Sequence, residues 1–160
     1  MARLFIPDRV DSDLPVFYNV DAVVGAAPAT NQPEDVLLVQ FLQRLLKERP
    51  TNPETRTFFA TMPLTGIVDQ QTIAGIVKIQ TNVKDKGFPG IIVDGRASPA
   101  KGYRYGAALY TIVMLNEVVQ QEHYDLWPRL DRMPEAPPRI THLVFRTLVG
   151  GRKGAIQPIS

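Results

Sequence analysis

Apolar residues recur at helical spacing in three stretches of the chain. In residues 34–49, leucines stand three or four positions apart, acidic residues open the stretch, and Pro50 ends it. A second stretch runs from about Gln70 to Gln80, and a third covers residues 106–121. Each places its apolar side chains on one face, so we expect three amphipathic helices that pack against one another. The expected fold class is therefore mainly α.

The segments on either side of these helices follow other patterns. Residues 14–20 are rich in β-forming side chains, which is typical of a strand or an extended strap. Apolar and mixed positions alternate over residues 139–149, which predicts a strand near the C-terminus. We expect an extended N-terminal arm (1–33), a helical domain (34–121), and a proline-rich segment with a strand and a tail (122–160).

The second and third helices each follow a turn that contains aspartate. Asp69 precedes the second helix, and Asp94, Gly95 and Pro99 precede the third. Aspartate at such positions caps a helix or closes a tight turn, and Thr72 stands three residues after Asp69, where the cap needs its partner. The alternative, a carboxylate pair for acid–base catalysis, has no support from neighbouring residues. The repeat of turn plus helix is the clearest organising feature of this sequence.

This order of elements resembles the peptidoglycan-binding domain-like family, a bundle of three helices found attached to cell-wall hydrolases and in phage and secretion proteins. The resemblance covers about half of the chain. It implies a three-helix peptidoglycan-binding-like bundle and non-catalytic binding of bacterial cell-wall peptidoglycan. Ser98 and Lys101 depart from the family's usual Gly and Thr, and residues 101–106 form an insert. The matching residues are Asp35, Val36, Val39, Gln40, Leu45, Leu46, Gly66, Val68, Asp69, Thr72, Ile76, Gln80, Val93, Asp94, Gly95, Pro99, Leu115 and Asn116.

The resemblance implies that the ligand lies in a shallow groove beside the third helix. We expect Tyr103 and Tyr105 to stack on sugar faces, Arg104 to pair with carboxylates of the stem peptides, and Asn116 to complete the contacts. The alternative is that residues 101–106 form a surface loop that packs on the C-terminal segment.

The net charge and the amino-acid composition argue against several classes of function. The formal net charge is +2 over 160 residues, which does not indicate nucleic-acid binding. The absence of cysteine excludes disulfides, thiolate metal sites and cysteine nucleophiles. His123 and His142 have no cluster of ligands at metal-binding spacing, and no nucleophile motif is present. We therefore expect neither an enzyme nor a bound metal or cofactor.

The first fifteen residues have no long apolar run, so neither a secretory signal nor a membrane span is expected. We expect cytoplasmic synthesis followed by release or by assembly into a particle, with no membrane contact. This context supports a second hypothesis, a structural or adaptor protein of a phage particle or contractile injection machine. Residues 1–33 and 139–160 would then contact protein subunits, because long arms cannot bury themselves on a small bundle.

Overall fold

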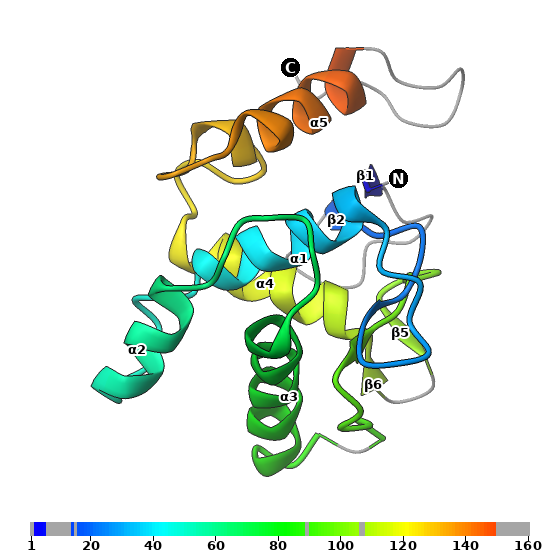
Figure 1. The fold of residues 1–160 in the computed structure, drawn as a ribbon, viewed down its shortest axis with the longest axis vertical. Coiled ribbons are helices and arrows are strands. Elements are labelled where there is room, and N and C mark those ends of the chain that lie inside the picture. The colour runs from blue at the N-terminus through cyan, green and yellow to red at the C-terminus, as the bar shows by residue number, and fades with distance from the viewer. Residues whose placement is uncertain (1, 6–13, 15, 89, 106–107, 150–160) are drawn as a thin grey trace.

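The computed structural model describes residues 2–5, 14, 16–88, 90–105 and 108–149. Within these residues, the prediction of a mainly α protein is confirmed (Figure 1). The α-helices are α1 (Pro33–Arg44), α2 (Pro53–Ala60), α3 (Gln70–Asp85), α4 (Thr111–Glu122) and α5 (Pro138–Val149), and η1 (Leu130–Arg132) is a 3-10 helix. Three antiparallel pairs of short strands join β1 (Arg3–Phe5) to β2 (Phe17–Asn19), β3 (Val24–Gly25) to β4 (Arg96–Ala97), and β5 (Arg104–Tyr105) to β6 (Ala108–Leu109).

The three helices expected from the sequence are α1, α3 and α4. Pro33 stands in the first turn of α1, where a missing N–H costs nothing. Asp69 caps α3 as predicted, because its Oδ1 accepts the Thr72 N–H at 2.7 Å. The predicted boundaries differ at three points: α1 ends at Arg44 rather than just before Pro50, α3 continues to Asp85, and α4 begins only at Thr111, because the β5–β6 hairpin precedes it.

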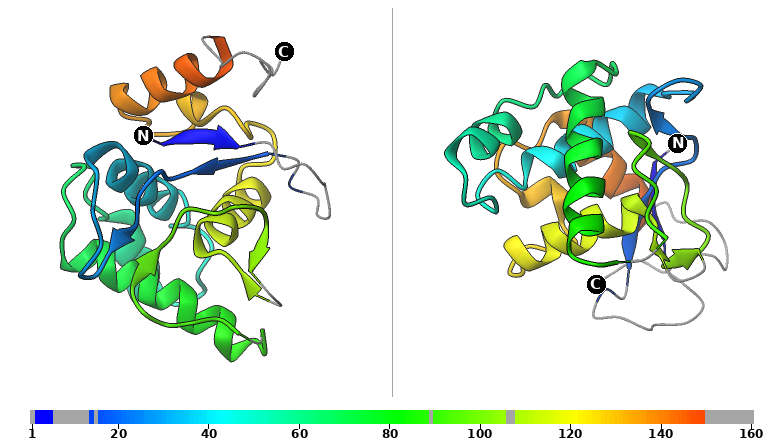
Figure 2. Two further views of the ribbon diagram at one scale, coloured as in Figure 1. Left: turned by 90° about the vertical axis from the view of Figure 1, so that its right-hand side faces the viewer. Right: turned by 90° about the horizontal axis from the view of Figure 1, so that it is seen from below.

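The elements surround one apolar core. Figures 1 and 2 show α3 running steeply across α1 and α4, with α5 on the opposite side of the molecule, beyond β1 and β2. The three predicted segments are not separate in this core. Leu4 and Phe17 come from the N-terminal segment, Phe41 and Leu115 from the central helices, and Ile140 from α5.

The N-terminal segment contains the expected extended structure, but its described residues do not form a free arm. Phe17 and Tyr18 of β2 are fully buried. The side chain of Asn116 on α4 takes the place of a neighbouring strand, because its Oδ1 accepts the Tyr18 N–H at 2.7 Å and its Nδ2 donates to the Tyr18 carbonyl at 2.8 Å. The apolar side chains of β2 are therefore covered by this chain itself, which removes one reason to expect a partner subunit here.

A buried carboxylate also holds the N-terminal segment against α1. Asp35 accepts the N–H groups of Asp21 and Ala22 at 3.3 and 3.0 Å. Burial raises the pKa of Asp35, and these two hydrogen bonds act in the opposite direction. The segment is thus attached by polar groups on two helices, α1 and α4.

We expect replacement of Asn116 by alanine to lower the free energy of unfolding by about 3 kcal/mol, because two buried backbone groups of Tyr18 lose their partners. Chemical denaturation followed by circular dichroism measures this loss. Asn82→Ala, at an exposed position of α3, is the matched control and should change stability by less than about 0.5 kcal/mol. Equal effects of the two substitutions would contradict this role for Asn116.

The prediction of a C-terminal strand is wrong, because residues 138–149 form α5. Ile140, Leu143 and Val144 are buried three and four positions apart, whereas Thr141 and His142 between them are exposed. This is the spacing of one helical face, and proline is favoured at the first position of a helix. α5 packs against β1 and η1, so the two ends of the described chain do meet, through a helix rather than a pair of strands.

Candidate ligand-binding groove

A buried glutamine on α1 holds the turn that precedes α3. The Oε1 atom of Gln40 accepts the N–H groups of Thr65 and Gly66 at 3.0 and 2.9 Å. Its Nε2 donates to the Ile67 carbonyl at 2.9 Å and to the Thr72 Oγ1 at 3.0 Å. Gly66 has a φ of 76°, a conformation that glycine adopts without strain. One side chain therefore fixes both the turn and the first turn of the next helix.

A second buried glutamine, on α3, holds the turn before β4 in the same way. The Oε1 atom of Gln80 accepts the N–H groups of Asp94 and Gly95 at 3.1 and 3.0 Å. Its Nε2 donates to the Arg96 carbonyl at 2.9 Å and to the Thr111 Oγ1 at 3.1 Å. The prediction that Asp94 and Gly95 form a turn is confirmed, because Asp94 Oδ1 accepts the Arg96 N–H and Gly95 has a φ of 70°. The turn before α3 and the turn before β4 are thus each held by the side-chain amide of one buried glutamine.

Pro99, the remaining predicted turn residue, lies between β4 and the β5–β6 hairpin. It follows the Asp94–Gly95 turn and β4, and the hairpin separates it from α4. The insert noted in the sequence therefore contributes β5, the first strand of the hairpin that precedes α4.

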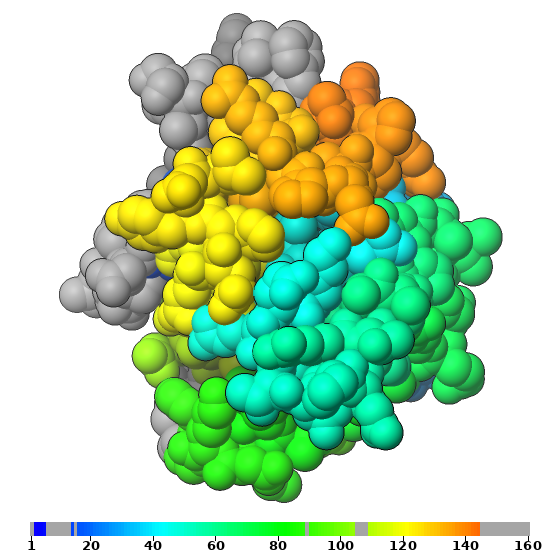
Figure 3. All heavy atoms as spheres, turned by 90° about the vertical axis from the view of Figure 1, so that its left-hand side faces the viewer, coloured from blue at the N-terminus to red at the C-terminus, as the bar shows by residue number. Residues whose placement is uncertain are grey.

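A groove of about 570 Å³ opens between α3 and α4 and is closed at one end by α2 and by the residues after α1. Figure 3 shows the side of the molecule on which α2, α3 and α4 reach the surface. The volume lies in the range of small-ligand sites. The apolar side chains that line the groove are Leu46, Phe59, Ile79, Val83, Phe88, Ile91, Leu109, Met114, Leu115 and Val118.

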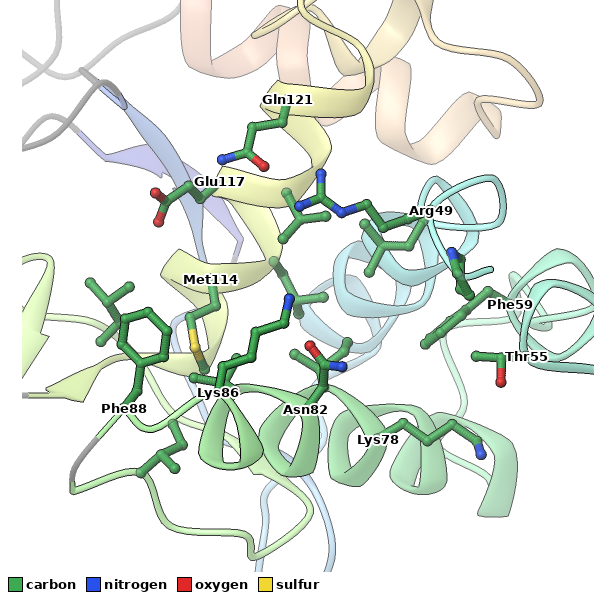
Figure 4. A pocket seen from close by; sticks show the side chains of 18 of the residues that line it. Arg49, Thr55, Phe59, Lys78, Asn82, Lys86, Phe88, Met114, Glu117 and Gln121 are labelled. Carbon is green, nitrogen blue, oxygen red and sulfur yellow. The ribbon is translucent and has the colours of Figure 1, made fainter. Parts of the chain in front are cut away.

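Cations outnumber carboxylates among the described residues that line this groove. Four lysine or arginine side chains line it, and Glu117 is the single carboxylate among them. Figure 4 shows Asn82 extending from α3, and Lys86 from the C-terminal end of that helix, into the groove, with Arg49 on the opposite side. This arrangement suits a ligand that carries both apolar groups and negative charge. The four cationic residues are Arg49, Lys78, Lys86 and Arg104.

The four residues expected to contact a ligand do not gather at one site. Tyr103 lines the groove, but it is 5% exposed and its hydroxyl donates to the Leu14 carbonyl, so its ring has no free face for a sugar. Arg104 is exposed and lines the groove. Asn116 is 0% exposed and bonded to β2, so it is not available to a ligand. The side chain of Tyr105 lies outside the described residues.

Tyr103 also does not pack on the C-terminal segment, which was the alternative expected for residues 101–106. Its ring lies 5.9 Å from that of Phe17, and its hydroxyl bonds to Leu14, so it packs on the N-terminal segment. Residues 106 and 107 lie outside the described residues.

A second helix that ends at Gln80, as the sequence predicted, leaves out Asn82 and Val83, which line the groove. α3 continues for five more residues to Asp85 and carries Asn82, and Lys86 is the residue that caps its C-terminal end. A signal was present: Lys78, Asn82 and Lys86 stand four positions apart, so they form one stripe along a helix. The apolar Ile79 and Val83 beside this stripe could have extended the predicted helix.

The described part of the chain contains no group of three or more histidine, cysteine, aspartate or glutamate residues that could hold a metal ion. Nor does any helix in it have the length and apolar character needed to cross a membrane. Comparisons with models of protein families, with curated proteins and with solved structures found no match to this chain.

Proposed function

We propose that the protein binds bacterial cell-wall peptidoglycan without catalysing a reaction, and that the groove between α3 and α4 is the binding site. The observation that carries this proposal is the groove itself, which has a volume of about 570 Å³, an apolar floor and more cationic than carboxylate side chains among the residues described. Among the described lining residues none is serine, histidine or cysteine. The described lining of the groove therefore offers contacts for a ligand but no Ser–His or Cys–His pair.

The two glutamine-held turns support the resemblance on which the proposal rests. Gln40, Gly66, Gln80 and Gly95 all belong to the matching positions, and the hydrogen bonds give a physical reason for these residue types there. α1, α3 and α4 contact one another pairwise. We propose that these helices and turns form a three-helix peptidoglycan-binding-like unit, to which α2, α5 and the strands are additions.

Co-sedimentation with insoluble peptidoglycan sacculi, over a series of salt concentrations, tests this function. We expect the wild-type protein to sediment with sacculi at high salt, because apolar contacts on the floor are not screened. Val83→Asp places a carboxylate on that floor and should weaken binding about ten-fold or more. Val93→Asp makes the same change at an exposed position that does not line the groove, and should leave binding unchanged.

Two results of this experiment would overturn the proposal. One is that the wild-type protein stays in the supernatant at every salt concentration. The other is that Val83→Asp and Val93→Asp bind equally well while both remain folded by circular dichroism, because the groove would then play no part.

A second candidate function is that of a structural or adaptor protein in a phage particle or injection machine. It is favoured by an exposed apolar surface beside the groove, made by Phe88, Ile92 and Val93, which are 47%, 60% and 37% exposed. Such surfaces mark contacts between proteins. Under this alternative the protein does not bind to sacculi. The wild-type protein self-associates at high concentration in analytical ultracentrifugation, and the Ile92→Asp variant does not.

A further inference from the structure

Two lysines that line the groove, Lys78 and Lys86, have no carboxylate partner among the described ion pairs. Arg44 and Lys47 both bind Glu135 at 2.9 Å, and Arg49 binds Glu122 at 3.1 Å. The hydrogen bond from Lys47 lowers the pKa of Glu135, as expected for a carboxylate paired with cations. For Lys86 the described residues provide no such partner, although its side chain extends into the groove (Figure 4).

The remaining polar groups on that side of the groove lie in line with Lys86. Lys78, Asn82 and Lys86 form one stripe along α3 and its C-terminal cap, and Lys78 Nζ lies 4.9 Å from the centre of the Phe58 ring. Asn82 is exposed and extends toward the groove in Figure 4. A primary amide can both donate to and accept from peptide groups. The stripe thus offers the positive charge of Lys86 and one amide beside an apolar floor.

The floor of the groove is poorly suited to a glycan strand. Sugar faces stack on exposed aromatic rings, but of the aromatic side chains among the described lining residues, Phe59 and Tyr103 are only 4% and 5% exposed. Among the described lining residues, Phe88 is the one aromatic residue whose ring is exposed to solvent. Aliphatic side chains such as Val83 and Val118 leave the hydroxyl groups of a sugar without hydrogen-bond partners.

We infer that the groove binds the stem peptide of peptidoglycan rather than its glycan strand, with a free carboxylate of the peptide at Lys86. This inference rests on the proposed function and specifies the part of the polymer that is recognised. The small apolar side chains of the peptide lie on the aliphatic floor, and Asn82 bonds to its amide groups. The groove volume of about 570 Å³ accommodates a short peptide.

Calorimetric titration of the full chain with three soluble probes tests this inference. The probes are stem peptides with free carboxylates, the same peptides with those carboxylates amidated, and glycan strands stripped of peptide. We expect the free acids to bind, the amidated peptides to bind about five-fold more weakly, and the glycan strands not to bind. Equal binding of acid and amide, or stronger binding of glycan than of peptide, would overturn the inference and leave peptidoglycan binding intact.

A pair of charge-reversal variants assigns the effect to Lys86. Lys86→Glu should weaken binding of the free-acid peptide roughly five- to ten-fold and change binding of the amidated peptide less. Lys84→Glu is the matched control, because Lys84 is exposed in the last turn of the same helix and does not line the groove. Equal losses in the two variants would show only a long-range charge effect and would overturn the placement of the carboxylate.

Failure of the proposed function gives a different pattern in the same experiments. If sacculi, stem peptides and glycan strands all fail to bind the folded wild-type protein, peptidoglycan recognition is wrong and the inference falls with it. If sacculi and stripped glycan bind and the stem peptides do not, the function stands and the inference alone is refuted.

Discussion

Replacement of Gln80 by alanine is expected to lower the free energy of unfolding by about 4 kcal/mol. The Gln80 amide accepts two N–H groups, from Asp94 and Gly95, and donates to the Arg96 carbonyl and the Thr111 hydroxyl. Gln80 is 1% exposed, so water cannot readily replace these bonds. Each buried polar group left without a partner costs about 1–3 kcal/mol, and the lost side chain also leaves a cavity.

Denaturant unfolding followed by circular dichroism measures this effect, with two comparisons. Gln70→Ala, at the exposed start of α3, should change the free energy of unfolding by less than about 0.5 kcal/mol. Gln40→Ala should cost as much as Gln80→Ala, because Gln40 makes the equivalent bonds to the other turn. A loss of less than about 1.5 kcal/mol in Gln80→Ala would contradict its proposed role in holding the turn.

Replacement of Gly25 by alanine is also expected to lower the free energy of unfolding by about 4 kcal/mol, because the added methyl group would clash with the backbone. Gly25 has a φ of 129°, and a Cβ atom there would lie 2.0 Å from the backbone oxygen of Gly95 and 3.0 Å from the Cα of Arg96. Both contacts are with backbone, so no flexible side chain can move away. Relief requires separation of β3 from β4, which are paired through Gly25 and Arg96.

Alanine substitutions at two other glycines distinguish the effect of a steric clash on stability from the effect of an unfavourable backbone φ. A Cβ atom at Gly87 would meet nothing within 4 Å, but its φ is 85°, so Gly87→Ala should cost only about 1 kcal/mol of backbone strain. Gly102 has open space and no such φ, so Gly102→Ala should be close to neutral. Thermal and denaturant unfolding of the three variants gives the comparison. If Gly25→Ala is no less stable than Gly87→Ala, the close approach to Gly95 is refuted.

Gln80 and Gly25 both contact the turn formed by Asp94 and Gly95. Gln80 bonds to Gly95 from α3, and Gly25 packs on its carbonyl from β3. Gln80 also bonds to Thr111 at the start of α4, so this one side chain links α3, the turn and α4. The groove lies between those two helices, which makes the turn a structural support of the proposed binding site.

The amino-acid sequence by itself determined the helices whose signals are local. The cap of α3 needs only Asp69 and Thr72 three residues apart, and Pro33 is read directly as the start of the first helix. Pro50 only sets an outer limit, because α1 already ends at Arg44. The glycine turns were also predictable, because aspartate and glycine favour such turns whatever surrounds them. Bonds of this kind join residues close in the chain, so their geometry depends little on the rest of the molecule.

The tertiary structure alone decided the features that join distant segments. The apolar run at 139–149 is short enough to fit either periodicity, and packing of Ile140, Leu143 and Val144 in the shared core accompanies the helix. Asn116 bonds to Tyr18, 98 positions away, so no local pattern could show that it serves β2 rather than a ligand. The groove likewise draws its lining from α2, α3, α4 and the residues after α1. Its chemistry exists only once those elements are packed, because each contributes too few side chains to form a site alone.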